Sequence, residues 1–412
     1  MNRTLLAATA MYLLFIVYGS LVPLELRDLS ITDAYSQFSR INYLQLGAGS
    51  RADWIANILL YIPLAFGLSA SFGGVRHPLA RLLLALFVGI FCLALAIGVE
   101  FAQLFFPPRT VSLNDLIAET LGTLIGLLTW HFFGAYTSQL YAHLKQGSLL
   151  SAKAAIIFYA VIYIALSLFP FDFVATHAEL DDKLANGHDA LLLPFDACTA
   201  EPLRCGVKLF AEIAALLPLG MLFCFLPYLQ HRRTVAVLVG LFLGIGIEIV
   251  QVFLLSGSGQ GLSVLTRVLG MGLGASLWGW GKQLPLSELT ALLRRLFWLS
   301  LLPYIGLVLA INGWFSADWL TLDEALTKLV ETRFLPLYYF YYTSEGVALV
   351  SLLSNVGMYL PVGLLCWLRF FSAAPPHKPA PHWIFAGILA AVFALIVETG
   401  KLFVPDKHAD PS

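Results

Sequence analysis

Long runs of apolar residues alternate with short polar stretches along the whole chain of 412 residues. A helix that crosses a bilayer needs about 20 mostly apolar residues. Eleven runs are long enough, and they predict spanning helices at residues 5–24, 54–72, 79–105, 116–133, 154–171, 207–228, 234–255, 262–280, 296–315, 347–371 and 383–404. The pattern therefore predicts an all-α fold, a polytopic transmembrane helical bundle with eleven spans.

The composition supports this prediction and excludes several other classes of protein. Hydrophobic residues make up 59% of the chain and charged residues 12%, and the mean hydropathy is +0.81. Soluble domains are about half apolar and about a quarter charged, so this chain has too little polar surface for water. Its net charge is -1 and its basic residues form no continuous face, which argues against a nucleic-acid partner. The lipid bilayer is the expected surrounding.

The positions of the positive charges predict the orientation in the membrane. Basic residues collect in the loops after every second predicted span, and those loops hold one acid, Glu288. These basic residues are Arg76, Arg81, Lys145, Lys153, Arg232, Arg233, Lys282, Arg294, Arg295, Arg369 and Lys378. Because Lys and Arg mark cytoplasmic loops, we expect a protein of the inner (cytoplasmic) membrane with its N-terminus in the cytoplasm. An odd number of spans places the C-terminus of this chain outside.

Three short motifs recur in a fixed order along the chain. The first is Asn57-x-x-x-Tyr61-x-Pro63, which returns as Asn355-x-x-x-Tyr359-x-Pro361 and, in weaker form, as Glu212 six residues before Pro218. The second is Glu100-x-x-Gln103, which returns as Glu248-x-x-Gln251 and Glu398-x-x-Lys401. The third is the glycine pair Gly122 and Gly126, which returns as Gly270 and Gly274. The shared order and spacing predict an internal repeat.

We expect three repeats, at residues 1–145, 146–290 and 291–412. The first two contain four spans each, and an even number gives successive repeats the same orientation in the membrane, as parallel repeats. The third contains three predicted spans, so a twelfth helix has either been lost or lies beyond this chain.

These motifs resemble the VanZ-like family. The first repeat carries the full family pattern, namely Asn57, Tyr61, Pro63, Glu100, Gln103, Pro107, Arg109, Asp115, Gly122 and Gly126. The second is degenerate, with Ser263 at the position of Asp115 and Arg267 at that of Glu119. The resemblance implies a multi-pass helical protein of the bacterial envelope, and it suggests lipid-linked cell-wall or polysaccharide precursors as the class of partner.

The first repeat gathers the candidate binding residues at one end of its spans. Glu100 and Gln103 lie on one face of a helix, Arg109 follows in a short turn, and Asp115 and Glu119 lie one turn apart on the next helix. Charged groups inside a membrane normally face a partner or a wet cavity. Arg109 is suited to an anion, so one interpretation is an outward-facing pocket for a polar head group, to which Asn57 and Tyr61 are added as candidates.

The alternative is that these side chains only hold helices together. Glu100 could pair with Arg109, and Gln103 and Asn57 could bond across helix interfaces. The equivalents in the other repeats are Glu248, Gln251, Arg267, Asn355, Tyr359, Glu398 and Lys401. Of these, Arg267 is expected to pair with Glu119 or Glu248 and so to join one repeat to the next.

Cysteines and catalytic motifs add little chemistry. Cys198 and Cys205 flank a short outward loop and form a candidate disulfide, whereas Cys92, Cys224 and Cys366 lie in spans as apolar residues. The histidines show no zinc-ligand spacing, so no metal site is predicted. The sequence contains no metalloprotease, nucleophile-elbow, Walker A or dinucleotide-binding motif, which predicts no cofactor and favours a non-catalytic protein without excluding an enzyme.

Three functions remain open. The first is an envelope protein that engages an anionic lipid-linked glycan or cell-wall precursor at the outer leaflet and influences envelope or exopolysaccharide assembly or glycopeptide sensitivity, that is, antibiotic resistance. The second is a proton-coupled secondary transporter that uses Glu100, Glu248 and Glu398. The third is a non-catalytic membrane scaffold.

Overall fold

Each predicted apolar run forms a helix in the computed structural model. The structure describes the chain apart from residues 1, 44–46, 76, 147–148, 193–201, 227–228, 230–231, 258–259, 282–287, 289–290, 292–293, 317, 344, 371–381, 406, 408 and 410–412. The described part contains nine helices long and apolar enough to cross a membrane and two shorter apolar ones, at Lys153–Leu168 and Phe297–Ile311. Together they correspond to the eleven predicted segments, which confirms an all-α polytopic membrane bundle.

The chain divides into two compact units, Met1–Gln283 and Leu284–Ser412, and each is described by itself. The helices of the first unit are α1 (Arg3–Leu21), α2 (Ile31–Phe38), α3 (Ala48–Ser71), α4 (Pro78–Gln103), α5 (Leu113–Gln146), α6 (Leu149–Leu168), α7 (His177–Leu192), α9 (Pro202–Phe225), α10 (Arg233–Val252) and α11 (Gly261–Gly281). Those of the second unit are α13 (Phe297–Ile311), α14 (Leu322–Glu331), α15 (Tyr338–Tyr341), α16 (Glu345–Phe370) and α17 (His382–Lys401).

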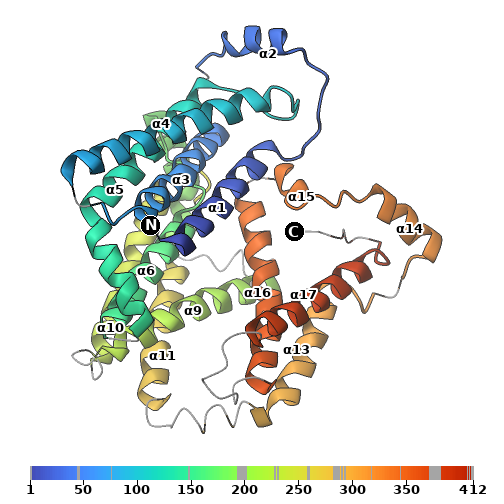
Figure 1. The fold of residues 1–412 in the computed structure, drawn as a ribbon. Coiled ribbons are helices and arrows are strands. Elements are labelled where there is room, and N and C mark those ends of the chain that lie inside the picture. Colours follow the sequence, from blue (N-terminus) through green and yellow to red (C-terminus); the bar gives the residue numbers. More distant parts are fainter. Residues whose placement is uncertain are drawn as a thin grey trace. The chain divides into compact units, whose positions relative to one another are not determined.

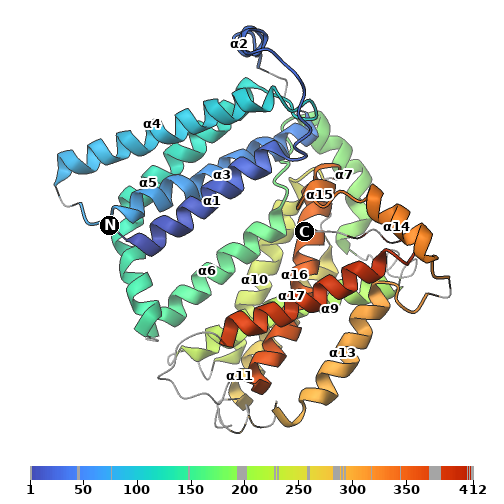
Figure 2. The same ribbon diagram turned by 45° about the vertical axis from the view of Figure 1, so that its right-hand side comes forward.

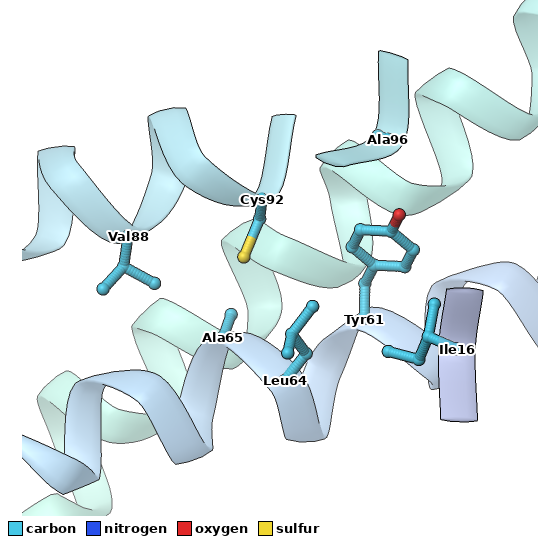
Figure 3. Close-up of a cluster of buried hydrophobic side chains, with 7 residues drawn as sticks. All are labelled: Ile16, Tyr61, Leu64, Ala65, Val88, Cys92 and Ala96. Carbon is cyan, nitrogen blue, oxygen red and sulfur yellow. The ribbon is translucent and has the colours of Figure 1, made fainter. Parts of the chain in front are cut away.

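In the first unit, α1, α3, α4 and α5 lie side by side (Figures 1 and 2). Their core is a cluster of buried side chains from α1, α3 and α4, namely Ile16, Tyr61, Leu64, Ala65, Val88, Cys92 and Ala96 (Figure 3). Helices α6, α9, α10 and α11 enclose a comparable cluster that includes Leu216, Cys224, Ala236 and Met271. Two bundles of four helices therefore follow each other in the chain, and each has its own core.

The glycine pairs set the distance between the second and fourth helices of each bundle. A Cβ atom on Gly126 of α5 would lie 2.5 Å from the carbonyl oxygen of Ile62 on α3, and one on Gly270 of α11 would lie 2.6 Å from that of Ile213 on α9. Contacts this short exclude any side chain. Gly122 and Gly274 meet backbone oxygens in the same way. The pairs therefore allow backbones to touch, as small residues do in membrane helices.

The described residues also form α2, α7, α14 and the short α15, which lie outside the predicted spans and were not predicted. Of these, α2, α7 and α14 each follow the first spanning helix of their repeat. Each begins at a Ser or Thr whose hydroxyl accepts a hydrogen bond from the backbone N–H three residues later: Ser30 from Asp33, Thr176 from Glu179 and Thr321 from Glu324. A Ser/Thr-x-x-Asp/Glu sequence marks the start of a helix, so the signal was present in the chain.

The third repeat shares this connection although it lies in a unit of its own. In each repeat, a backbone N–H before the short helix donates 2.8 Å to a carbonyl just after the third span: Arg27 to Phe105, Val174 to Phe253 and Leu320 to Phe403. A basic side chain adds a second bond to the same region, from Arg27 Nε to Leu104, from Lys183 Nζ to Gly257 and from Lys328 Nζ to Val404. These bonds fix the segment that follows the third span to the segment around the short helix.

Candidate functional site

The first repeat brings its predicted acidic residues together between α3, α4 and α5. The Asn57 amide donates to Asp115 Oδ1 at 2.8 Å, and the Ser112 hydroxyl donates to Asp115 Oδ2 at 2.7 Å. The Ser112 N–H donates to Glu100 Oε2 at 3.2 Å. Asp115 thus joins α3 to α5, while Glu100 of α4 caps the turn that leads into α5.

Two carboxyl groups of this cluster are buried next to each other. Glu100 is 2% exposed and Glu119 is 3% exposed. Glu119 Oε2 and the hydroxyl of fully buried Tyr61 have no hydrogen-bond partner within the described residues. The cluster therefore combines two buried carboxyl groups with a hydroxyl that can donate or accept a hydrogen bond.

Arg109 and Gln103 bind backbone at the end of α1. The Arg109 guanidinium donates to the carbonyl oxygen of Gly19, and the Gln103 amide donates to that of Ser20 at 2.9 Å. Gln251 makes the equivalent bond to Ser167 at 2.8 Å in the second repeat. The predicted bonding of Gln103 across a helix interface is thus a feature of both repeats.

The second repeat contains an ion pair where the first has two acids. Arg267 of α11 pairs with Glu248 of α10, and both residues are buried, at 4% and 5% exposed. Arg267 Nε also donates to the Tyr163 hydroxyl at 3.0 Å, and Glu248 accepts from the N–H of Gln260. The expectation that Arg267 joins one repeat to the next is wrong, because α10 and α11 are neighbours in one bundle and its side chain meets the facing helix.

Donor and acceptor have changed places at another pair of equivalent positions. In the first repeat Asn57 donates to Asp115, whereas in the second the hydroxyls of Ser263 and Thr266 donate to Glu212 at 3.0 and 2.6 Å. Glu212 was recognised as a motif position but not as a site residue. The sequence signal that Glu212 is a site residue is its correspondence to Asn57 in the repeated motif.

The third repeat neutralises its glutamate in another way. Glu398 accepts from Lys401 Nζ at 2.6 Å, one turn along α17, and from the hydroxyl of Tyr359 on α16 at 3.1 Å. Lys401 stands at the position of Gln103. The repeated glutamates of the second and third repeats thus each have a cation beside them.

A polar cavity of about 190 Å³ lies in the second repeat, at the end of the bundle that holds these residues. It is lined by Ser167, Phe169, Lys208, Glu212, Gln251, Leu254, Ser256, Gly257, Ser263 and Arg267. Gln251 and Arg267 were predicted as site residues; Lys208, Ser256 and Ser263 were not. The Lys208 ammonium donates to Gln260 Oε1 at 2.7 Å and lies 4.0 Å from Glu212, and half of its side chain is exposed.

Among the cysteines, Cys92, Cys224 and Cys366 are free and buried. Cys205 takes part in a disulfide. Its predicted partner, Cys198, lies outside the described residues, so their pairing stays a prediction. Within the described ranges, no three His, Cys, Asp or Glu side chains are placed to hold a metal ion.

The two bundles of the first unit are joined by an ion pair between α3 and α7. Arg51 Nη2 lies 2.5 Å from Glu179 Oε1, and Nη1 donates to Oε2 at 3.2 Å and to the carbonyl of Phe173 at 2.6 Å. The hydrogen bonds from Arg51 and from the backbone N–H of Ala175 lower the pKa of Glu179 to about 2. This bidentate ion pair, and not Arg267, connects the first repeat to the second.

We expect Glu179→Gln to loosen the first turn of α7, because the amide weakens the contacts to Arg51, Ala175 and Thr176. A lowered pKa means that the pair contributes fully above pH 4.5, the ordinary value for Glu, and is lost as the pH falls toward about 2. Hydrogen exchange at Ala175 and Thr176, corrected for intrinsic rates, should be faster in the variant at neutral pH and stay slow in the unmodified protein down to about pH 3. Asp181→Asn on the same helix is the control, and equal exchange in both variants would contradict the assignment.

The fold and this site define a class: a polytopic helical membrane protein built from tandem repeats, with a polar cluster at one end of each bundle. The chain belongs to the VanZ/LLP1 family, whose model matches residues 6–134 and again 156–282, together more than half of the chain. Comparison with curated proteins and with solved structures finds no match.

Proposed function

We propose that this VanZ/LLP1 membrane protein binds the anionic head group of a lipid-linked glycan or cell-wall precursor at the outer leaflet. By this binding it influences envelope or exopolysaccharide assembly, or glycopeptide sensitivity. The observation that supports the proposal is the polar cavity of the second repeat, which lies among apolar spanning helices and is lined by Lys208 and Arg267.

The charges of the cavity suit a small anion. Arg267 is already paired with Glu248, whereas the half-exposed Lys208 ammonium contacts, among the described residues, Gln260 at 2.7 Å and the Glu212 carboxylate at 4.0 Å. Lys208 can therefore turn toward a phosphate oxygen with little loss of other contacts. A volume of about 190 Å³ corresponds to roughly six waters, which is enough for a phosphate group but not for a whole glycan. The sugar would project into solvent and the lipid tail into the bilayer.

Mass spectrometry of the protein extracted under mild conditions tests the proposal, by looking for a co-purifying lipid. Lys208→Gln should reduce the retained anionic lipid about tenfold, the effect of losing one charge-assisted hydrogen bond. Lys153→Gln is the matched control, because Lys153 lies near the start of α6, the opposite end from Ser167. Equal retention of bulk phospholipid in all three proteins would reject a specific head-group site.

The first repeat was the predicted binding site, and Arg109→Ala tests it in the same experiment. Arg109 is bound to the end of α1, so its loss should alter lipid retention only if that contact opens for a ligand. Loss of lipid in Arg109→Ala but not in Lys208→Gln would move the proposed site to the first repeat.

Proton-coupled transport is the second candidate, and one observation favours it. Glu248 and Glu398 each form an ion pair, whereas Glu100 and Glu119 of the first repeat are both buried and form none within the described residues. A transport function would therefore rest on the first repeat alone. Glu100→Gln should then abolish a pH-gradient-driven flux in proteoliposomes while Glu398→Gln leaves it unchanged.

A further inference from the structure

An apolar groove of about 730 Å³ runs between α16 and α17 in the second unit. From α16 it is lined by Leu352, Asn355, Val356, Tyr359, Leu360, Gly363, Leu364 and Trp367, and from α17 by Ala386, Gly387, Ala390, Ala391 and Ala394. Val356 is 52% exposed and Leu360 is 58% exposed. Small residues on α17 leave the floor of the groove open.

The first repeat shows what covers the same surface there. Counting from the shared Pro63 and Pro361, the α16 residues Val356, Tyr359 and Leu360 correspond to Ile58, Tyr61 and Ile62 of α3. Those α3 residues lie against Gly122 and Gly126 of α5, the fourth helix of the repeat. Tyr61 is fully buried as a result.

The α17 side of the groove has the same correspondence. Counting from Glu100 and Glu398, Ala386, Ala390 and Ala394 correspond to Val88, Cys92 and Ala96 of α4. These three are buried in the core that α3 and α4 form beside α5, at 0–2% exposed. Both walls of the groove thus match surfaces that are covered in the first repeat.

The covering helices share a sequence pattern. In α5, Asp115 stands seven residues before Gly122, and Gly126 follows four residues later; in α11, Ser263 stands seven residues before Gly270, and Gly274 follows four residues later. The polar residue bonds to Asn57 or Glu212 on the facing helix, and the glycines meet its backbone.

The third repeat retains the matching polar group. Asn355 is the counterpart of Asn57 and lines the groove, and within the described part of the chain its side chain makes no hydrogen bond. A polar amide in an apolar groove favours an occupant that offers an acceptor at this depth. Lipid tails supply none.

We propose that this groove is the docking site for a transmembrane helix of a partner polypeptide. The fitting helix carries Asp, Asn or Ser, then six residues, a small residue, three residues and a second small residue. Its first polar side chain bonds to Asn355, and its small residues lie on Val356, Leu360 and Gly363. Helices α5 and α11 carry this pattern but are already packed in their own repeats, so neither of them is the occupant.

A synthetic peptide of residues 113–134 with a photo-crosslinker is the probe, added to the purified full chain in nanodiscs. We expect it to crosslink to α16 and α17 and to bind at least about tenfold more weakly when Gly122 and Gly126 of the peptide are replaced by Ile, since overpacking of this kind is costly. Leu360→Trp in the full chain should weaken binding similarly. Leu360 is exposed, so this variant should fold.

Leu395→Trp on α17 is the matched control, because Leu395 is 68% exposed and does not line the groove. Binding should persist in this variant. Three results would each overturn the proposal. The first is crosslinks confined to residues 1–283, the second is equal binding of the peptides with and without the glycine replacements, and the third is undiminished binding to the Leu360→Trp protein. In those cases lipid fills the groove.

Discussion

Arg267→Ala should destabilise the protein by about 3–5 kcal/mol, because it leaves Glu248 charged, buried and without its partner. The remaining hydrogen bond from the Gln260 N–H is too little to stabilise a carboxylate in this position. Tyr163 loses a donor in the same step. Thermal unfolding in detergent measures the effect. Arg267→Glu, which recreates the two facing acids of the first repeat, should also lower the melting temperature.

A double variant separates the loss of a partner from the loss of packing. Arg267→Met combined with Glu248→Leu removes both charges and keeps the volume apolar, and it should recover most of the stability, since apolar replacements of buried ion pairs are often neutral. If the single variant melts like the unmodified protein, the ion pair is not formed in the membrane protein as it exists in detergent. If the double variant is as unstable as the single one, side-chain packing and not charge carries the effect.

The order of spans could be predicted from the sequence because lipid imposes a simple rule on it. A spanning segment must be apolar over about 20 residues, so each run of hydrophobic residues marks a helix. The motifs Glu100-x-x-Gln103 and Gly122-x-x-x-Gly126 predicted which residues face neighbouring helices. Gln103 and Gly126 do so in the structure. The boundaries of the three repeats at residues 145 and 290 stay predictions.

Partner choice within the site could not be predicted in the same way. Arg267 stands at the position of Glu119, but the sequence does not say whether its side chain reaches the facing helix or a neighbouring repeat. The packing of α10 on α11 decides this. The exchange of donor and acceptor between Asn57–Asp115 and Glu212–Ser263 is likewise visible only once α9 and α11 are placed together. Sequence shows which polar residues recur, and packing determines what each one binds.

The three repeats differ in which residue lies beside the glutamate of the third span. Each repeat has a glutamate near the end of its third span, buried in the first two repeats and partly exposed in the third, and its charge needs compensation. Arg267 supplies it in the second repeat and Lys401 in the third, whereas the first repeat places Glu119 there. Neutralised glutamates act as fixed links between helices. The first repeat therefore has two buried acids where each of the other repeats has an acid and a cation.

Gly274→Leu should destabilise the second repeat by about 1–3 kcal/mol, because the new side chain would overlap the backbone of α9. Even a Cβ atom on Gly274 would collide with the carbonyl oxygen of Leu217, and backbone cannot move aside as a flexible side chain can. Helices α9 and α11 must then separate, which also widens the cavity between Glu212 and Arg267. Gly246→Leu on α10 is the matched control, since a Cβ there meets nothing within 4 Å and a better helix former should be neutral or slightly stabilising. The melting temperatures of the two variants test this prediction. Equal melting temperatures would mean that the α9–α11 contact does not depend on close approach of the backbones. A lower melting temperature in Gly274→Leu alone would show that the glycine pair keeps the walls of the polar cavity at their distance.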